Sequence, residues 1–177
     1  MDFSKVILMT DLDGTLLTDD KQILPGDFEA IERFRRGGGL FTMATGRGYA
    51  MAKHIADMLR LDCPAVVYNG AAVYDFRQER FLWQCAIGDN APWIIKRIAE
   101  EYPDIGVEVL RGNTVYVPFL NEMEQWHLDL EHVPADFTPL DDIPRDGWLK
   151  VLFAYPPEKL DGLEKFVEST PEFQGVH

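Results

Sequence analysis

The sequence has few cysteines, no long apolar run and little positive charge. Its two cysteines, Cys63 and Cys85, lie in unlike surroundings, which argues against a disulfide framework and favours reduced thiols in a cytoplasm. No segment approaches the roughly 20 apolar residues of a membrane-spanning helix, and the first residues carry no signal pattern. We therefore expect a soluble cytoplasmic protein.

The balance of charge also excludes partners. Seventeen Lys and Arg residues stand against thirty Asp and Glu residues, which gives a net charge of −13. A chain this acidic is repelled by nucleic acids and by anionic membrane surfaces, so neither is expected as a partner.

The first half of the chain predicts alternating strands and helices. Apolar runs end at polar or turn residues in three places, which predicts strands at 6–9, 40–44 and 65–68. Helical spacing predicts a helix at 27–36 and a second one that follows Thr45-Gly46-Arg47. The pattern indicates a parallel sheet whose first strand is buried on both faces.

The second half of the chain shows a different pattern of predicted strands and helices. Strands are predicted at 81–87, 106–119 (a pair around a turn) and 148–155, and helices at 91–102, 123–130 and 157–167. This indicates an α+β module with its own core, to which we assign the four tryptophans. We expect two domains, at residues 1–81 and 82–177.

Two carboxylates follow the first strand directly. Asp11 and Asp13 are two residues apart, so an extended backbone points both the same way, and Gly14 permits the turn that follows. In a parallel sheet ligands bind outside the carboxyl ends of the strands. One carboxylate can attack phosphorus while the other transfers protons, and the pair attracts Mg²⁺.

The ends of the next two strands add groups suited to phosphate. Thr45 offers a hydroxyl, and the helix after it offers backbone N–H groups at its positive end. Arg47 supplies a fork of donors for a phosphate or an acidic group. Asn69 ends the third strand, where fixing a turn is its main expected role.

These segments resemble a known family. Residues 6–17, the tetrapeptide 44–47 and the tetrapeptide 68–71 are similar to the haloacid dehalogenase (HAD) superfamily, and more narrowly to its Cof-type phosphatases with a type IIB cap. The resemblance implies a Rossmann-like α/β core with a parallel sheet, of which the N-terminal strands are present, and an α+β cap domain.

The resemblance also implies a reaction. Asp11 would be the nucleophile that forms an aspartyl-phosphate, and Asp13 the general acid and base; both would serve a Mg²⁺ ion. Thr45 would hold the phosphoryl group, with Gly46, Arg47 and Asn69 as further substrate-binding residues. The expected activity is Mg²⁺-dependent hydrolysis of small phosphorylated metabolites such as sugar phosphates.

Three other functions stay open at this point. A phosphomutase of the same superfamily would use the same two aspartates. A non-catalytic module would bind phosphate and turn nothing over. A signalling phosphoacceptor domain shares a strand-end aspartate, but the second module and the Thr-Gly-Arg triplet argue against it.

Two family motifs are missing from this sequence. Neither the lysine that steadies the phosphate nor the Gly-Asp-x-x-Asn-Asp segment follows the second module. Right-handed crossovers place both helices on one face of a three-stranded sheet, so we expect the other face, near Val6, Leu8, Phe41 and Val66, to be bare. We expect the N-terminal part of a longer protein, with a missing segment or self-association covering that face.

The four histidines do not predict a metal site. His127 and His132 are five residues apart, which places them on different faces of a helix, and we expect no metal role for these two, for His54 or for His177.

Overall fold

The computed structural model describes residues 2–131 and 134–173. The chain divides into two compact units, Met1–Cys85 and Ala86–His177, each with its own core. His132 and His177 lie outside the described residues. No helix among the described residues combines the length and the apolar character that a bilayer crossing requires.

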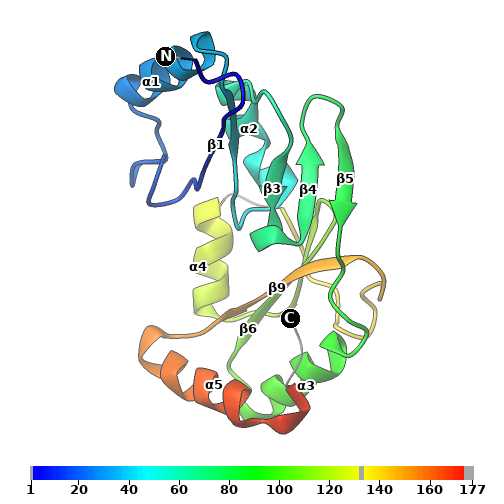
Figure 1. Ribbon diagram of the computed structural model, residues 1–177. Coiled ribbons are helices and arrows are strands. Elements are labelled where there is room, and N and C mark those ends of the chain that lie inside the picture. Colours follow the sequence, from blue (N-terminus) through cyan, green and yellow to red (C-terminus); the bar gives the residue numbers. More distant parts are fainter. Residues whose placement is uncertain (1, 132–133, 174–177) are drawn as a thin grey trace. The chain divides into compact units, whose positions relative to one another are not determined.

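The first unit is a Rossmann-like α/β arrangement (Figure 1). Its elements are β1 (Ile7–Thr10), α1 (Pro25–Arg36), β2 (Leu40–Met43), α2 (Tyr49–Leu59), β3 (Ala65–Val67), the 3-10 turn η1 (Tyr68–Gly70), β4 (Ala72–Asp75) and β5 (Arg80–Gln84). Strands β1 and β2 are parallel, and a parallel bridge between Ala44 and Val66 continues that direction to the middle of β3. The three predicted strands are present, but only β1 and β2 form a parallel ladder, and β3 joins that direction through one bridge.

A hairpin at the end of this unit was not predicted. Strands β3, β4 and β5 form an antiparallel sheet, and the turn between β4 and β5 is held by Asp75, whose Oδ1 accepts the N–H groups of Arg77 (2.9 Å) and Gln78 (3.0 Å). The sequence assigned the β5 segment to the second module. Its pairing with β4 joins it to the first unit instead.

Both helices of the first unit pack on one face of its sheet. Ile31 of α1 and Ile55 of α2 belong to the same buried cluster as Phe41 and Met43, which alternate along β2 and so share a face. Ile55 and Leu59 form the buried side of α2, whereas Met58 is exposed.

Strand β1 is not the buried strand that the sequence predicts. Its side chains and Val6 before it are 44–58% exposed over Val6 to Met9. One edge of β1 pairs with β2, and no other described strand pairs with the opposite edge. The exposure does not mark the single bare face that was predicted, because Leu8 is in register with the buried Phe41 whereas Ile7 and Met9 point to the opposite face, and all three are exposed. Val66 is only half-buried.

The second unit is a four-stranded sheet with helices. Its elements are α3 (Ala91–Glu101), β6 (Gly106–Arg111), β7 (Thr114–Phe119), α4 (Glu122–Glu131), β8 (Ala135–Asp136), β9 (Trp148–Ala154), α5 (Pro157–Ser169) and the 3-10 turn η2 (Pro171–Phe173). The strand order is β8-β7-β6-β9, with antiparallel pairs except for β7 and β8. This confirms the predicted α+β pattern; β8 was not predicted.

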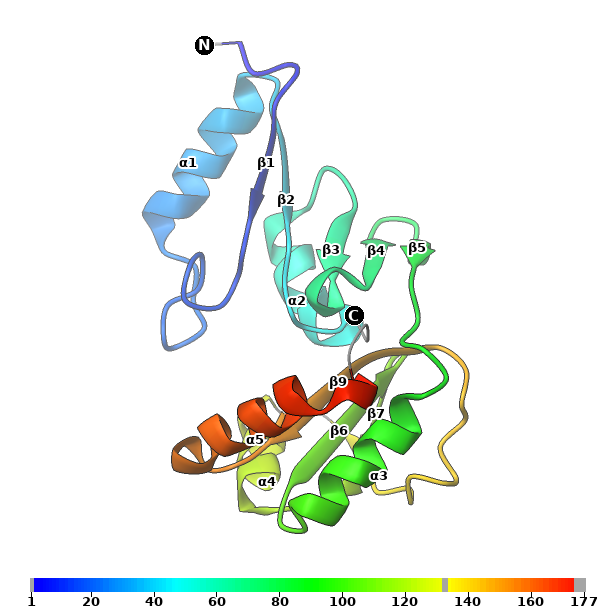
Figure 2. The ribbon, with the colours of Figure 1, turned by 60° about the horizontal axis from the view of Figure 1, so that its bottom comes forward.

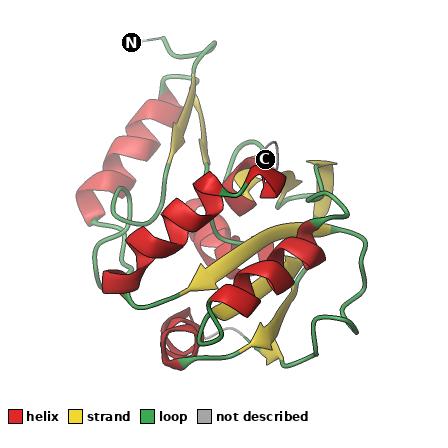
Figure 3. Ribbon diagram, turned by 90° about the horizontal axis from the view of Figure 1, so that it is seen from below, coloured by secondary structure: helices red, strands yellow, loops and turns green. Residues whose placement is uncertain are grey.

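Helices cover both faces of this sheet. Helices α3 and α5 lie on one face (Figure 2 and Figure 3), where Ile95 and Leu163 pack with Val107 and Val109 of β6. Helix α4 lies against the opposite face of β6. The outcome for the tryptophans is mixed, because Trp148 is buried in the core whereas Trp83, Trp93 and Trp126 are exposed.

Candidate active site

The ends of β1, β2 and β3 come together through backbone hydrogen bonds. The Ala44 N–H donates to the Thr10 carbonyl (2.8 Å), and the Thr45 N–H donates to the Val66 carbonyl (3.0 Å). The Asn69 N–H then donates to the Thr45 carbonyl (3.2 Å). This ladder fixes the loops that carry the predicted site residues at one edge of the sheet, as expected for parallel strands.

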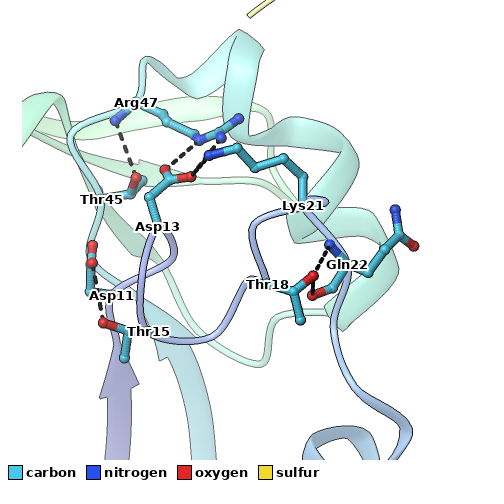
Figure 4. A network of polar contacts seen from close by, with 8 residues as sticks. All are labelled: Asp11, Asp13, Thr15, Thr18, Lys21, Gln22, Thr45 and Arg47. Atoms are coloured by element: carbon cyan, nitrogen blue, oxygen red, sulfur yellow. Dashed lines mark hydrogen bonds and ion pairs between the residues drawn. The ribbon is translucent and has the colours of Figure 1, made fainter. Parts of the chain in front are cut away.

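Asp13 is the centre of a cationic cluster (Figure 4). Arg47 donates two hydrogen bonds of 2.8 Å to Asp13, one from Nε to Oδ2 and one from Nη2 to Oδ1. Lys21 Nζ donates a third, to Oδ1, at 2.7 Å. The side chain of Asp13 is 40% exposed, whereas that of Arg47 is 11% exposed. The bidentate contact is the strong form of an Arg–carboxylate pair.

These contacts hold Asp13 in its charged form. The hydrogen bonds from Arg47, with a further one from Lys21, keep the pKa of the Asp13 carboxyl well below its usual range, against an opposing effect of partial burial. As the cluster stands, Asp13 is therefore a poor proton donor near neutral pH.

Asp11 lies on the other side of the same loop. Its Oδ2 accepts a long hydrogen bond of 3.5 Å from Thr15 Oγ1, and the residue is exposed. Leu12 between the two aspartates is fully buried and lies in a turn, so the two exposed carboxylates contact different partners rather than sharing one extended face. Gly14 has a φ of +72°, which confirms the expected turn after the pair.

Thr45 and Arg47 are linked locally. Thr45 is buried, and its Oγ1 accepts the backbone N–H of Arg47 at 3.2 Å, which fixes the hydroxyl in the loop before α2. Helix α2 begins at Tyr49, four residues after Thr45, so the first turn of the helix lies beside this loop.

Asn69 borders the loop through its side chain. A Cβ atom on Gly46 would lie 2.8 Å from Asn69 Oδ1, so only a glycine at position 46 allows this approach without a shift. Asn69 itself has a left-handed backbone (φ 55°), which is a turn conformation that asparagine tolerates. This geometry agrees with a turn-forming role for Asn69.

Lys21 is a site residue that the sequence did not indicate. It lies in a polar turn, which the Thr18 N–H closes by donating to the Gln22 carbonyl at 2.9 Å. Lys21 has a φ of 57° there, and its side chain reaches back to Asp13. A lysine eight residues after an aspartate carries no signal of such a contact, because the turn geometry creates it.

Comparison with known proteins gives the family. The model of the haloacid dehalogenase-like hydrolases matches residues 8–174. The chain is 38% identical over 76 residues to the pyridoxal phosphate phosphatase YbhA of Escherichia coli K12. The aligned region covers 43% of this chain and 28% of the relative. It is 30% identical over 152 residues to the HMP-PP phosphatase of Serratia proteamaculans, with coverages of 85% and 54%.

A solved structure has the same fold. The HAD subclass IIB sugar phosphatase BT4131 superposes with a TM-score of 0.74 at 20% identity, over 91% of this chain and 63% of that one. The matched part is thus 28% and 54% of the two curated relatives' lengths. The resemblance expected from the motifs is confirmed, and the chain belongs to the haloacid dehalogenase-like hydrolases, a family whose relatives here are named phosphatases.

Proposed function

We propose that the protein is a phosphatase that hydrolyses the phosphate esters of small molecules through an aspartyl-phosphate on Asp11. The observation that carries the proposal is the gathering of Asp11, Asp13, Thr45 and Arg47 at one edge of the sheet, in a chain of this family. The names of the two relatives and of the sugar phosphatase support a small phosphorylated substrate, with sugar phosphates as one class.

The chemistry follows from the two carboxylates. A carboxylate oxygen of Asp11 attacks phosphorus, the bond from phosphorus to the ester oxygen breaks, and Asp13 gives its proton to the leaving alkoxide. Water then attacks the aspartyl-phosphate as Asp13 takes a proton from it, and inorganic phosphate leaves Asp11. The hydroxyl of Thr45 and the guanidinium of Arg47 hold the phosphoryl oxygens.

The ion pairs of Asp13 add a condition to this scheme. Asp13 cannot donate a proton while Arg47 and Lys21 both bind it, because they favour its charged form. A phosphate dianion competes for the same two cations. When Arg47 and Lys21 turn to the substrate, the pKa of Asp13 rises toward its ordinary value, so Asp13 takes up and gives a proton more readily than it does within the ion pairs.

The donor set fits a hard divalent cation. Mg²⁺ binds proteins through one or two carboxylates together with phosphate oxygens and water. Asp11, exposed and only weakly engaged by Thr15, would hold it, whereas the Asp13 carboxylate would join after releasing Lys21. When bound, the ion would offset the repulsion between the Asp11 carboxylate and the phosphate.

The exposed strand β1 motivates a second proposal. Four consecutive apolar side chains from Val6 to Met9 face solvent beside an unpaired strand edge in the described part of the chain, which is an unstable surface for a monomer. We propose that this chain self-associates through β1. Sedimentation tests this with Leu8→Lys: the variant is expected to be monomeric, and association equal to that of the parent would refute it.

The function is tested with Asp11→Asn. The full-length gene product is assayed against a chromogenic phosphate monoester and sugar phosphates with Mg²⁺ present. Asp11→Asn is expected to lower turnover at least about 1,000-fold, since it removes the nucleophile. Asp19→Asn changes an exposed aspartate in the nearby turn and is the matched control.

The same assay separates the alternatives. Turnover by Asp11→Asn equal to that of the control would overturn the nucleophile assignment. Release of inorganic phosphate marks a phosphatase, whereas movement of the phosphoryl group to another hydroxyl of the sugar would mark a phosphomutase. Phosphate binding without turnover would mark a binding module.

A further inference from the structure

The second unit buries two glutamates beside a histidine. Glu108 lies in the middle of β6 and is 3% exposed; Glu124 and His127 lie one turn apart on α4, and Glu124 is 0% exposed. One potential ligand atom from each of the three lies within 4.8 Å of the others. His127 was expected to have no metal role, yet it has two acidic neighbours, because Glu124 precedes it by three residues on α4 and Glu108 lies beside it on β6.

The backbone enforces this arrangement. A Cβ atom on Gly106 would lie 2.7 Å from the Cβ of Glu124, so the glycine lets α4 pack directly onto β6 at this point. Asn121 fixes the start of α4: its Nδ2 donates to the carbonyls of Asp104 and Ala154 (2.8 Å each), and its Oδ1 accepts the Glu124 N–H (2.7 Å). Helix α4 is thus anchored to the chain before β6 and to β9.

Glu124 lacks the partners that a buried carboxylate needs. A glutamate at the third position of a helix usually reaches back to the N-cap N–H, but neither Oε1 nor Oε2 of Glu124 has a hydrogen-bond partner among the described residues. An uncompensated buried carboxylate costs several kcal/mol, and a second carboxylate beside it adds repulsion. His127 brings at most one positive charge against two negative ones.

The same surroundings disfavour the charged form of the Glu124 carboxyl. Burial, together with the negative charge of Glu108, raises the pKa of Glu124 to about 7.

We propose that Glu108, Glu124 and His127 bind a divalent transition-metal ion of the Zn²⁺ class that joins α4 to β6. His127 Nδ1 lies 3.3 Å from Glu108 Oε2, which is about the edge of a tetrahedron with metal–ligand bonds of roughly 2.0 Å. Three protein ligands leave a fourth position for water. An imidazole nitrogen in the set favours Zn²⁺ over Mg²⁺ and Ca²⁺, which prefer oxygen alone.

The test uses Co²⁺ as a spectroscopic substitute for Zn²⁺. The full chain carrying Asp11→Asn and Asp13→Asn, which removes the carboxylates of the proposed active site, is titrated with Co²⁺ at pH 7.5. One equivalent is expected to bind and to give the strong visible absorption of a four-coordinate Co²⁺ ion, and Zn²⁺ is expected to displace it.

Variants locate the site. In the same background, Glu124→Gln and His127→Gln are each expected to weaken Co²⁺ binding at least about 100-fold, since each removes one of three ligands. Glu122→Gln, an exposed glutamate on the same helix, is the matched control and is expected to bind as the parent does. Glu124→Gln keeps the shape of the side chain and removes its charge, and circular dichroism checks that the fold is intact.

Two results would overturn the proposal. One is the absence of Co²⁺ and Zn²⁺ binding up to about 1 mM in the parent, which would mean that a proton rather than a metal compensates the two glutamates. The other is binding that Glu124→Gln and His127→Gln leave unchanged, which would place the ion elsewhere. Because the background lacks the active-site aspartates, neither result bears on the proposed phosphatase activity.

Discussion

The two units treat a pair of carboxylates in opposite ways. In the first unit Asp13 is partly exposed and is bound by Arg47 and Lys21, which lower its pKa. In the second unit Glu124 is fully buried beside Glu108, and its pKa is raised to about 7. The first pair lies in loops at strand ends, whereas the second is held by a strand and an anchored helix.

The two sites differ in how freely the groups around the carboxylates can move, and this suits them to different functions. In the proposed mechanism the cations beside Asp13 turn to an incoming phosphate, and the turn position of Lys21 suits such a movement. The groups around Glu124 are packed between α4 and β6 and have no such freedom. A movable cationic cluster suits turnover, and a rigid buried carboxylate pair suits the permanent binding of a proton or a metal.

The largest expected effect comes from breaking the pair at Asp13. Arg47→Ala removes a bidentate partner of Asp13 and a proposed ligand of the phosphate, so kcat/KM is expected to fall about 100- to 1,000-fold. Steady-state kinetics of the full-length protein measure this. Arg36→Ala, an exposed arginine on α1, is the control, and equal activity of the two variants would contradict the role of Arg47.

The next effect in size is the pH dependence of the free energy of unfolding that the Glu124 carboxyl causes. With a chelator present, the folded protein keeps the proton on Glu124 up to about pH 7, whereas the unfolded chain loses it near its ordinary value. The unfolded state therefore binds fewer protons over this window, and the free energy of unfolding falls as pH rises from about 4.5 to 7, by about 3 kcal/mol. Urea denaturation at several pH values measures this decrease.

Glu124→Gln sharpens that prediction. The amide has no carboxyl proton to lose, so the variant is expected to be more stable than the parent at pH 8 and to show a smaller decrease between pH 4.5 and 7. Glu122→Gln is expected to match the parent. A parent whose stability is flat over this window would contradict the raised pKa of Glu124.

The smallest expected effect is at Lys21. Its ion pair with Asp13 joins two side chains that are each about 40% exposed, so its contribution is on the order of 0.2–1 kcal/mol. Lys21→Ala is expected to weaken competitive inhibition by inorganic phosphate by up to about fivefold. Lys5→Ala serves as the control, and a stronger inhibition in Lys21→Ala would contradict a phosphate-binding role.

The sequence predicts the polar cluster at the strand ends well. The positions of Asp11, Asp13, Thr45 and Arg47 follow from local rules: an apolar run ends, a turn follows, and parallel strands bring their ends to one edge. Lys21 is absent from that prediction because its contact depends on the geometry of a turn, which composition does not specify.

The buried glutamates could be recognised only in part. A glutamate between Val107 and Val109 breaks an apolar strand, and Glu124 stands three residues before His127, so both carry a weak signal. Their contact joins positions 16 residues apart on a strand and a helix, and it depends on Gly106 allowing close packing. The sequence also could not predict that β1 is exposed. An apolar run indicates a strand that can be buried, but it does not show whether another element covers that strand.

A carboxyl ¹³C NMR titration of the metal-free protein, with and without inorganic phosphate, tests the contrast between the two pairs most directly. We predict that Glu124 titrates near pH 7, that Asp13 titrates well below its usual range, and that phosphate moves Asp13 upward and leaves Glu124 unchanged. If both groups titrated near pH 4, with no response of Asp13 to phosphate, the cationic cluster and the buried pair would not differ as described.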